Sequence, residues 1–542
     1  MKFNKIKAFI FAASLALLMG NTSCVGDLDV TPINPQQTME ADNDALFNKV
    51  YASFALTGQT GPAEPDGSGD VVDIDEGQSD FYRMSWYLNE FTTDEAHWVW
   101  ATDAGVPDLL YNSYGASNVF SVGFYYRLYF TITLCNFYLE QVPEDGTPET
   151  AMRRAEVRFI RALQYYYVMD MYANAAFMTT VSSDLAERYT RSQFFEFVES
   201  ELLGCVNDMA DAGQNTYGRV DKVAAWNLLS RLYLNAEVYT GTARWKDAMD
   251  YADMVINNGY YHLCTVGATN PSTGEVYSPY QMLFLADNNE TDARYEMIFP
   301  VLFDGVTTKS YGGMNFLILA AYSSDMSVNV PSGTNNSWNR CTRVRQQLLD
   351  KFFPTSTAPA ANSIAAMTAA ANDDRALFYG EGFTPSIEDE SEQTAGYGCV
   401  KFRNVRSDGQ PNQVIDYVNT DLPLFRVAEA YLTYAEASTR LNGVNTDASE
   451  KINALRRRAN AATQNVYTLD NILDEWSKEF WFEGRRRMDL IRFNRFGGQA
   501  SYKWEWMGGT YSGAQFGNYM NIFAIPENDL TNNSNLIQNP GY

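Results

Sequence analysis

The chain has 542 residues and a formal net charge of −26 at pH 7. This excess of negative charge argues against nucleic acid and anionic membrane surfaces as partners, because both are negatively charged. Hydrophobic residues make up 46% of the chain and aromatic residues 14%, enough for a sizeable core with rings left for the surface.

The first 24 residues have the features of a bacterial lipoprotein signal. A basic start and an apolar run over residues 8–19 are typical of a secretory signal peptide, which predicts cleavage after residue 23. Small residues precede Cys24 as in a lipobox, although Asn21 stands where an aliphatic residue is usual. Acylation of Cys24 would anchor the protein, since each buried CH₂ contributes ~0.8 kcal/mol. A secreted protein in which Cys24 is incidental remains the alternative.

Residues 24–37 contain two prolines and are predicted to be a polar tether after the lipidated cysteine. From about residue 38 the apolar spacing becomes helical. Residues 58–69 are rich in Gly, Pro and Asp, which predicts a loop.

The next segment carries Trp98 and Trp100 among acidic and basic side chains. Two Trp at positions i and i+2 share a face only in an extended backbone, where they would form a flat platform for the apolar C–H faces of successive sugars. The competing interpretation is that both rings belong to the core, since large aromatic residues are mostly buried.

Long helical patterns follow. They cover residues 125–141, 149–172, 222–239 with 245–257, and 424–441. Small Ala at crossing points with Leu and Tyr between them is the pattern of tetratricopeptide-like helix pairs, although the match to the 34-residue period is loose. Residues 265–421 alternate short β-like runs such as 297–303 with Gly, Ser, Asn and Pro clusters, and residues 355–372 are predicted to be a loop or a weak helix.

A dense block of acids, bases and aromatics occupies residues 472–493. Glu479 and Glu483 lie one turn apart and could be imagined as a glycosidase pair. Such a pair lies across a cleft, normally on different elements, and needs one carboxyl with a raised pKa. Neighbouring Arg residues would keep both ionised, so a structural ion-pair network is the better interpretation.

Cysteine and histidine are sparse. Beyond Cys24 the chain has five widely spaced cysteines, which predicts buried free thiols and no disulfide framework. His97 and His262 are the only histidines, which leaves little material for a zinc site or a His-dependent triad.

Several of these segments together resemble the SusD/RagB family of outer-membrane nutrient-binding lipoproteins of Bacteroidetes. The segments that carry the resemblance are 158–162, 218–225, 424–432, 453–456, 479–492, 525–526 and 538–542. The resemblance implies a mainly α fold with four tetratricopeptide-like helix pairs, long irregular loops and short β hairpins. It implies one glycan-binding domain over 38–542, with helices mainly in 38–262 and 422–495 and a loop-rich insertion at about 263–421.

The resemblance also implies location and partners. The protein is expected in the outer membrane, anchored through Cys24 and facing the exterior, as a lid on a SusC-type TonB-dependent β-barrel transporter. Other surface glycan-binding lipoproteins and amylases are expected to act beside it. Neither catalysis nor a required cofactor is expected.

The similarity extends to the starch-binding members of the family, whose ligand is starch or malto-oligosaccharide, an α-1,4-glucan. It implies sugar-contacting rings at Trp98, Trp100, Tyr311 and Trp338 and polar contacts at Asp75, Arg83 and Asp103. Asp103 departs from the family pattern, where Asn is expected; a carboxylate only accepts hydrogen bonds whereas an amide also donates.

A structural calcium ion is a further expectation from these members. Asp287, Asn289, Asn419 and Asp421 offer oxygen ligands of the kind that Ca²⁺ prefers. Two of the four are amides, and solvated loop polarity is the alternative.

Three functional alternatives stay open beside starch binding. The first is binding of another glycan or of peptides within the same family. The second is a glycoside hydrolase, and the third is a structural lid on the barrel without ligand contacts of its own.

Overall fold

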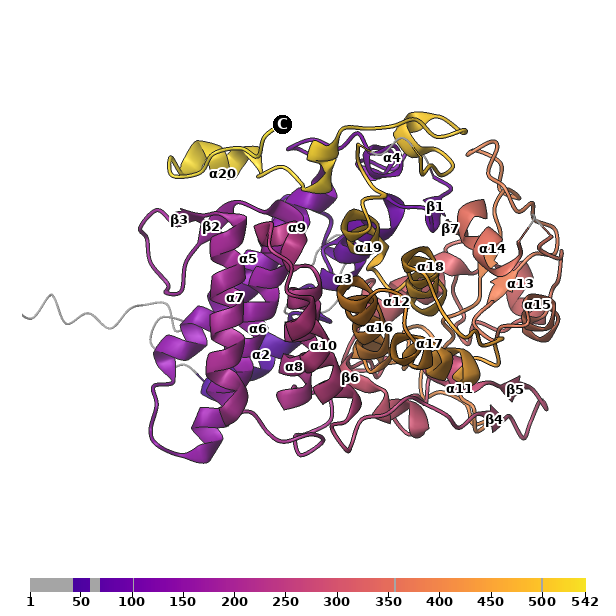
Figure 1. The fold of residues 1–542 in the computed structure, drawn as a ribbon, viewed down its shortest axis with the longest axis horizontal. Helices are drawn as coiled ribbons and strands as arrows, with labels where there is room; N and C mark the ends of the chain where they lie inside the picture. Colours follow the sequence, from indigo (N-terminus) through magenta and orange to yellow (C-terminus); the bar gives the residue numbers. More distant parts are fainter. Residues whose placement is uncertain (1–41, 59–68, 101, 355–356, 499–500) are drawn as a thin grey trace, which may run out of the picture. The chain divides into compact units, whose positions relative to one another are not determined.

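The computed structural model describes residues 42–58, 69–100, 102–354, 357–498 and 501–542 (Figure 1). The predicted signal peptide, Cys24 and the tether lie outside the described residues, so these remain predictions. Residues Phe47–Tyr542 form one compact unit, which is described here by itself. As the sequence predicts, the fold is mainly helical, and the strands within the described ranges form only two-stranded sheets.

The first half of the chain supplies the longest helices. They are α2 (Asn43–Ala52), α3 (Phe81–Trp86), α4 (Val106–Leu110), α5 (Val119–Gln141), α6 (Pro148–Tyr172), α7 (Arg191–Cys205), α8 (Lys222–Leu234), α9 (Ala236–Thr240) and α10 (Trp245–Ile256). Short 3₁₀ or π segments are η3 (Glu76–Gln78), η4 (Tyr87–Phe91) and η5 (Val206–Asp208).

The second half alternates shorter helices with loops. Its helices are α11 (Pro279–Met282), α12 (Gly313–Ala321), α13 (Ser324–Asn329), α14 (Gln346–Phe352), α15 (Ile364–Ala371), α16 (Ala428–Asn442), α17 (Thr446–Arg458), α18 (Leu469–Phe480), α19 (Arg486–Arg492) and α20 (Glu527–Asn532). The 3₁₀ segments are η6 (Asp292–Tyr295), η7 (Met507–Gly509) and η8 (Asn518–Asn521).

The strands are short and pair antiparallel. The pairs are β1 (Ala96–Trp98) with β7 (Thr342–Val344), β2 (Ala175–Phe177) with β3 (Glu187–Tyr189), β4 (Ala268–Thr269) with β5 (Val276–Tyr277), β6 (Met297–Val301) with β10 (Leu422–Arg426), and β8 (Phe378–Tyr379) with β9 (Gly398–Cys399). The β1–β7 and β6–β10 pairs join segments far apart in the sequence.

Helices pack in the neighbour-on-neighbour manner expected of tetratricopeptide-like pairs. Helix α5 packs on α6 and α6 on α7, whereas α8 packs on α10, α10 on α16 and α16 on α17 (Figure 1). Small side chains allow these approaches: Ala225, Ala248, Ala252 and Ala435 are fully buried at the packed faces. Helix α16 therefore joins the two halves of the chain although it lies about 170 residues beyond α10.

Two sequence expectations need correction. Residues 424–441 were expected to be one helix, but they begin inside β10 and enter α16 only at Ala428. The loop-rich insertion also contains α12, which the periodicity missed because all nine of its residues are buried. A helix buried on every side shows no amphipathic period.

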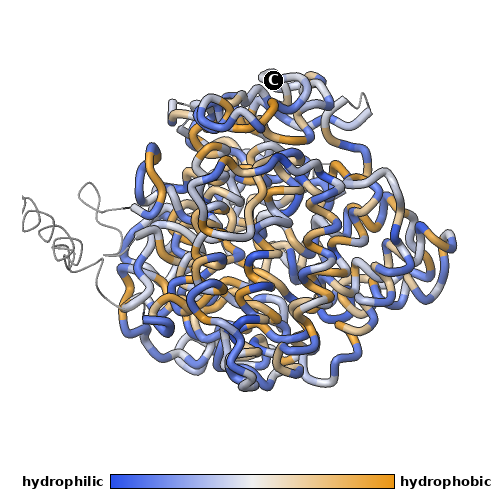
Figure 2. The backbone as a smooth tube through the Cα atoms, turned by 90° about the vertical axis from the view of Figure 1, so that its left-hand side faces the viewer, coloured by the Kyte–Doolittle hydropathy of each residue, from blue (hydrophilic) through white to orange (hydrophobic). Residues whose placement is uncertain are grey.

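Figure 2 shows short apolar and polar stretches alternating along the backbone trace. Across the described ranges, none of the helices has the length and apolar character needed to cross a membrane. Cys135, Cys205, Cys264, Cys341 and Cys399 are buried and free, as the sequence predicts.

The acidic and basic block near the C-terminus forms a buried ion-pair network, which confirms the structural interpretation of Glu479 and Glu483. Glu479 accepts from Arg426 at 2.6 Å, with Arg375 at 3.2 Å, and Glu483 pairs with Lys401 at 2.7 Å. Burial alone would raise the pKa of Glu479, but the surrounding guanidinium groups hold it well below its usual range. Glu479 therefore stays ionised, whereas a general acid needs a proton.

Two further buried glutamates tie α16 to other helices. Glu429 pairs with Arg231 of α8 at 2.6 Å, and Glu436 pairs with Arg492 of α19 at 2.7 Å. Burial would raise both pKa values, but the arginines lower each to about 2. An unpaired buried charge is strongly unfavourable, so these pairs hold the helices together only while both partners are charged.

We therefore expect acid to destabilise the fold in a defined window. A carboxyl whose folded pKa is depressed to about 2 from an ordinary 4.5 contributes stability above pH 4.5, and this contribution is lost as the pH falls toward 2. The free energy of unfolding, measured with urea at a series of pH values, should fall across this window.

Glu436→Gln should lower the free energy of unfolding at pH 7 by about 3–5 kcal/mol and flatten its pH dependence. Glu149→Gln, in an exposed pair with Arg153, is the matched control and should change it by less than about 1 kcal/mol. An unaltered pH profile in Glu436→Gln would contradict the assignment.

Candidate functional site

Trp98 and Trp100 lie where β1 meets β7. Trp98 pairs with Thr342 in the sheet, and the Val99 N–H donates to the Cys341 carbonyl at 2.8 Å. The strand ends at Trp98, and the two rings stand 5.6 Å apart at an interplanar angle of 89°. The two rings are nearly perpendicular, so the prediction that they form a flat platform is wrong.

The two Trp rings differ in exposure. Trp98 is 2% exposed, and its indole N–H donates to the Asp103 carboxylate at 2.8 Å. Trp100 is 39% exposed, and its ring meets the Trp98 ring edge to face. Trp98 thus fits the core interpretation and supports Trp100, which alone of the pair presents a free face.

Tyr311 lies just before α12, and Trp338 lies in the loop after α13. Their ring centroids lie 6.4 Å apart, and both side chains are half-buried. The Trp338 N–H donates to the Leu319 carbonyl of α12 at 2.7 Å, which fixes the loop that carries Trp338.

A single chain of ring contacts joins all four predicted aromatics. Tyr87 contacts Trp98 at 5.8 Å and Phe316 at 5.3 Å, and Phe316 contacts Trp338 at 6.1 Å. Tyr87 and Phe316 were not predicted from the sequence, because both rings are buried and a core aromatic carries no sequence signal of a supporting role. Exposed Trp100 and half-buried Trp338 and Tyr311 are called the aromatic arc below.

Arg83 lies buried at the centre of this arrangement. Its guanidinium donates to the carbonyls of Tyr311 and Gly77, each at 3.1 Å, and its Nε donates to the Tyr87 hydroxyl at 3.1 Å. The guanidinium carbon also lies 4.9 Å from the Trp338 ring centroid. Arg83 was predicted to contact sugar hydroxyls, and the structure gives it the additional task of positioning two arc residues.

Asp80 positions the Tyr311 segment from the other side and was also missed by the sequence analysis. Its carboxylate accepts from the backbone N–H groups of Arg83 at 2.8 Å and Gly313 at 2.9 Å. A Cβ on Gly312 would lie 1.9 Å from the Asp80 side chain, so only glycine fits there. Burial raises the pKa of Asp80, and its backbone hydrogen bonds partly offset that effect.

The polar residues predicted for sugar contact lie at the edges. Asp75 is exposed and caps η3 by accepting from the Gln78 N–H at 3.2 Å. Asp103 is half-buried, and the structure shows one of its oxygens accepting from Trp98. The other oxygen has no partner within the described part of the chain.

Three of the four predicted calcium ligands form a group with unsatisfied oxygens. Within the described residues, the buried side-chain carbonyl oxygens of Asn289 and Asn419 have no hydrogen-bond partner. Asp421 is buried and accepts from the Phe303 N–H at 2.8 Å and the Tyr217 hydroxyl at 3.0 Å; burial raises its pKa to about 7. Oxygen-only donors with two unsatisfied amide carbonyls fit a hard cation.

Asp287 is engaged elsewhere. Its carboxylate accepts from the Ser407 N–H at 3.0 Å and the Ser407 hydroxyl at 2.6 Å. The described residues contain no cluster of three or more His, Cys, Asp or Glu suited to a metal ion, so any cation site here depends on the two asparagines.

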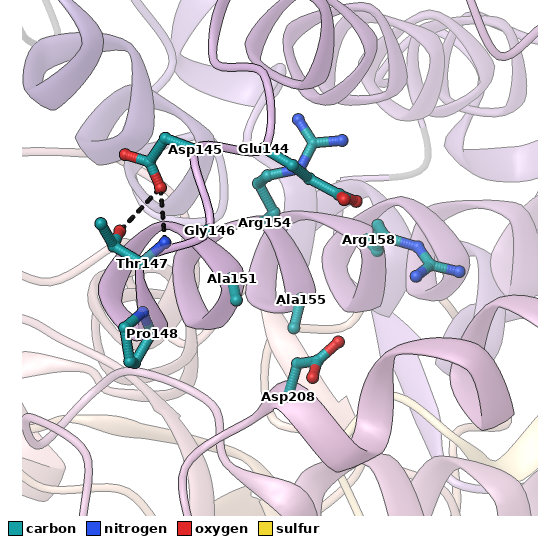
Figure 3. Close-up of a pocket in the computed structure, with 10 residues that line it drawn as sticks. All are labelled: Glu144, Asp145, Gly146, Thr147, Pro148, Ala151, Arg154, Ala155, Arg158 and Asp208. Carbon is teal, nitrogen blue, oxygen red and sulfur yellow. Dashed lines mark hydrogen bonds between the residues drawn. The ribbon is translucent and has the colours of Figure 1, made fainter.

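A separate hollow of about 360 Å³ lies at the start of α6 (Figure 3). Its lining residues are Glu144, Asp145, Gly146, Thr147, Pro148, Ala151, Arg154, Ala155, Arg158 and Asp208, none of them aromatic. Its cations are already bonded, Arg154 to the Leu139 carbonyl at 2.8 Å and Arg158 to Glu201 at 3.0 Å. This hollow therefore lacks the features of a sugar site.

Comparison with known families matches both halves of the chain. Residues 239–542 match the model described as "SusD family", and residues 28–234 match the model described as "Starch-binding associating with outer membrane". The chain is 39% identical to the starch-binding protein SusD of Bacteroides thetaiotaomicron, and the match covers 100% of both chains. It is 23% identical to a SusD-like protein of Bacteroides ovatus, over 90% of this chain and 81% of that one.

Solved structures share the fold. A SusD-like carbohydrate binding protein from Bacteroides fragilis superposes with a TM-score of 0.68 at 17% identity, covering 92% of this chain and 99% of that one. The surface glycan-binding protein A from Bacteroides fluxus superposes with a TM-score of 0.66 at 18% identity, covering 93% and 100%. These likenesses confirm the mainly helical fold predicted from the sequence.

The central position of Arg83 generates a prediction. Arg83→Lys keeps the charge but loses the planar fork, so the Gly77 and Tyr311 carbonyls should lose their partners. We expect a loss of about 1.5–3 kcal/mol in the free energy of unfolding and a weaker near-ultraviolet circular dichroism signal, with helix content unchanged.

Arg495→Lys is the control, because the Arg495 side chain pairs with exposed Asp470 and donates a hydrogen bond to the Ser501 hydroxyl, away from the arc. Arg495→Lys should change neither the free energy of unfolding nor the near-ultraviolet circular dichroism signal. Wild-type stability and spectrum in Arg83→Lys would show that the guanidinium does not hold the site.

Proposed function

Because the chain belongs to the SusD family, we propose that it binds starch and malto-oligosaccharides through the aromatic arc of Trp100, Trp338 and Tyr311. The observation that carries this proposal is the chain of ring contacts from Trp100 to Tyr311, organised by buried Arg83. The relative of Bacteroides thetaiotaomicron, 39% identical over its full length, is named as starch-binding.

The physical chemistry of the arc suits an α-1,4-glucan. Each glucose presents an apolar C–H face that a ring can cover and hydroxyls that polar side chains can bond. An α-1,4-linked chain curves, so rings tilted relative to one another, such as Tyr311 and Trp338 at 54°, follow several residues better than a flat platform does. With ~1 kcal/mol per ring contact and the hydrogen bonds to sugar hydroxyls added, we expect an affinity in the micromolar to millimolar range.

The buried members of the ring chain have supporting roles in this proposal. Trp98 holds the edge of Trp100 and fixes Asp103 through its indole N–H. The free oxygen of Asp103 then accepts from a sugar hydroxyl, and Asp75 does the same at the η3 edge. A binder of a different glycan remains the second candidate, since it would use the same rings with other polar contacts.

We further propose that the protein is anchored in the outer membrane through lipidated Cys24 and delivers glycan to a SusC-type TonB-dependent transporter without cleaving it. The family description places its members in association with the outer membrane. Glu479 is paired with Arg426 and Arg375, which argues against a catalytic role for the Glu479 and Glu483 carboxylates in glycoside hydrolysis. Many such lipoproteins meeting one polymer would retain it through avidity.

A structural Ca²⁺ is proposed at Asn289, Asn419 and Asp421. The support is chemical: two buried amide oxygens that have no hydrogen-bond partner among the described residues, and a buried carboxylate. When bound, the ion would supply the charge that these oxygens face, and it would fix the loop before β10. Asp287 would not bind the ion, because its carboxylate already accepts from the Ser407 hydroxyl; this bond would help to hold the loop in place.

The arc is tested by isothermal titration calorimetry of soluble protein beginning at Val25 with maltoheptaose, α-cyclodextrin and a β-glucan. Wild-type protein should give heat with the α-glucans alone. Trp100→Ala, Tyr311→Ala and Trp338→Ala should each weaken binding about tenfold. Each removes one stacking contact of ~1 kcal/mol together with the polar contacts of the same side chain to sugar hydroxyls.

Tyr511→Ala is the matched control, since Tyr511 is 38% exposed and lies outside the arc. Full affinity in all three arc variants would remove the arc as the binding site. Heat with the β-glucan instead would favour the second candidate.

The calcium site is tested by thermal unfolding with CaCl₂ or with EDTA. Calcium should raise the Tm of wild-type protein, because a ligand that binds only the folded state stabilises it by mass action. Asn419→Ala should abolish this increase, whereas Asn412→Ala, on the same loop, should preserve it. Equal responses of the two variants would place any bound cation elsewhere.

A further inference from the structure

Residues 260–263 carry a second group of partly exposed rings that shares no residue with the aromatic arc. Tyr260 lies 5.4 Å from Tyr295, and His262 stacks on Tyr295 at 5.3 Å and 22°. Tyr260 and Tyr295 are half-buried, and the His262 side chain is 52% exposed. Tyr431 of α16 is half-buried nearby and lines the same hollow as His262. Tyr260, His262, Tyr295 and Tyr431 are called the tyrosine cluster below.

Two hollows meet at this cluster. One, of about 620 Å³, is lined by His262, Leu263, Thr265, Pro279, Tyr431, Ala454, Arg457 and Arg458. The other, of about 110 Å³, has Tyr217, Tyr260, Tyr261 and Arg294 among its lining residues. The two hollows share no lining residue, but residues 260 and 261 line one and residues 262 and 263 line the other, so both lie against the same short segment. Each hollow has an aromatic ring in its wall on which a sugar could stack.

The polar groups of the cluster are available to a ligand. In the part of the chain that the structure describes, the hydroxyls of Tyr260, Tyr295 and Tyr431 have no hydrogen-bond partner. Neighbouring tyrosines with structural roles differ: the Tyr217 hydroxyl donates to Asp421 at 3.0 Å and the Tyr261 hydroxyl donates to Asp221 at 2.8 Å. Arg458 lines the larger hollow and is 7% exposed, and within the same described residues its buried Nε has no acceptor.

The rings are held in place before any ligand arrives. The Asn258 side chain accepts from the backbone N–H groups of Tyr260 at 2.9 Å and Tyr261 at 2.8 Å. The His262 N–H donates to the Tyr295 carbonyl at 2.9 Å. A Cβ on Gly213 would lie 2.5 Å from the Tyr260 ring, so this ring rests directly on glycine backbone. Rings that are already fixed lose little conformational freedom when a ligand binds, which lowers the entropic cost of binding.

Three of the cations at the cluster are paired with carboxylates. Arg457 pairs with exposed Glu450, and Arg458 pairs with Glu296 at 2.9 Å and with Glu479. His262 faces Asp292 at 3.9 Å. These three cations therefore each face a carboxylate, whereas the guanidinium of Arg294 lies over the rings of Tyr217 at 5.2 Å and Tyr295 at 5.6 Å. The free donors and ring faces match the hydroxyls and C–H faces of an uncharged sugar.

We propose that the tyrosine cluster is a second binding surface for a neutral glycan, independent of the aromatic arc. The choice of starch as the probe rests on the proposed function. The second site itself is inferred from the tyrosine cluster alone. Two sites on one protein would bind a long polymer more tightly than a short oligosaccharide, because the second contact is intramolecular.

The test is electrophoresis through native gels that contain starch, with parallel gels containing other neutral glucans and mannans. Four proteins are compared: wild type, the arc variant Trp100→Ala/Tyr311→Ala/Trp338→Ala, the cluster variant Tyr260→Ala/Tyr431→Ala, and the combination of both. Tyr511→Ala serves as the exposed-ring control, and the thermal unfolding of each variant is measured to show that it is folded.

We expect the arc variant to keep a residual retardation in at least one glycan, and the combined variant to lose it. Tyr260→Phe/Tyr431→Phe, which keeps the rings but not the hydroxyls, should show an intermediate loss. If the alanine cluster variant unfolds, the phenylalanine variant in the arc-variant background decides the question: unchanged residual retardation would overturn the proposal.

The outcomes separate the two proposals. Complete loss of retardation in the arc variant, with a wild-type result for the cluster variant, would overturn the second site and leave the arc standing. Full retardation in the arc variant, lost in the cluster variant, would overturn the arc and support the cluster. No retardation of wild-type protein in any glycan would overturn both.

Discussion

The buried guanidinium of Arg83 is the constraint on which the aromatic arc depends. It joins three segments that are remote in sequence, by bonding the carbonyls of Gly77 and Tyr311 and by lying over the ring of Trp338. A lysine ammonium group lacks the planar fork of donors, so it could not bond both carbonyls and stack on the Trp338 ring at the same time. Since the arc residues sit on loops, their relative placement comes from this side chain and from Asp80 more than from regular secondary structure.

The helical frame provides the rigid support that such loops need. Buried Glu429 on α16 pairs with Arg231 of α8 and so connects the two halves of the chain, and buried Glu436 pairs with Arg492 of α19 within the second half. Buried ion pairs are weak evidence for stability in themselves, because desolvation offsets their attraction. Their value here is geometric: each pair is satisfied in only one arrangement of the helices.

The sequence predicts the frame better than the site. Long amphipathic helices such as α6 and α10 were visible in the apolar spacing, whereas fully buried α12 was not. The arc residues were predicted from similarity to family motifs and not from the apolar spacing. The orientation of Trp98 and Trp100 was not predictable, because β1 ends at Trp98 and a turn closed by the Asp103 N–H and the Trp100 carbonyl redirects the chain. Contacts such as Phe316 with Tyr87, more than 200 residues apart, carry no local signal.

The central claim is that an α-1,4-glucan lies along Trp100, Trp338 and Tyr311. A crystal structure of the protein with maltoheptaose tests it most directly. The account predicts a curved oligosaccharide whose glucose faces cover these three rings, with Trp98 still buried and bonded to Asp103. Oligosaccharide bound only away from these rings, or a crystal grown in saturating maltoheptaose without sugar on them, would contradict it.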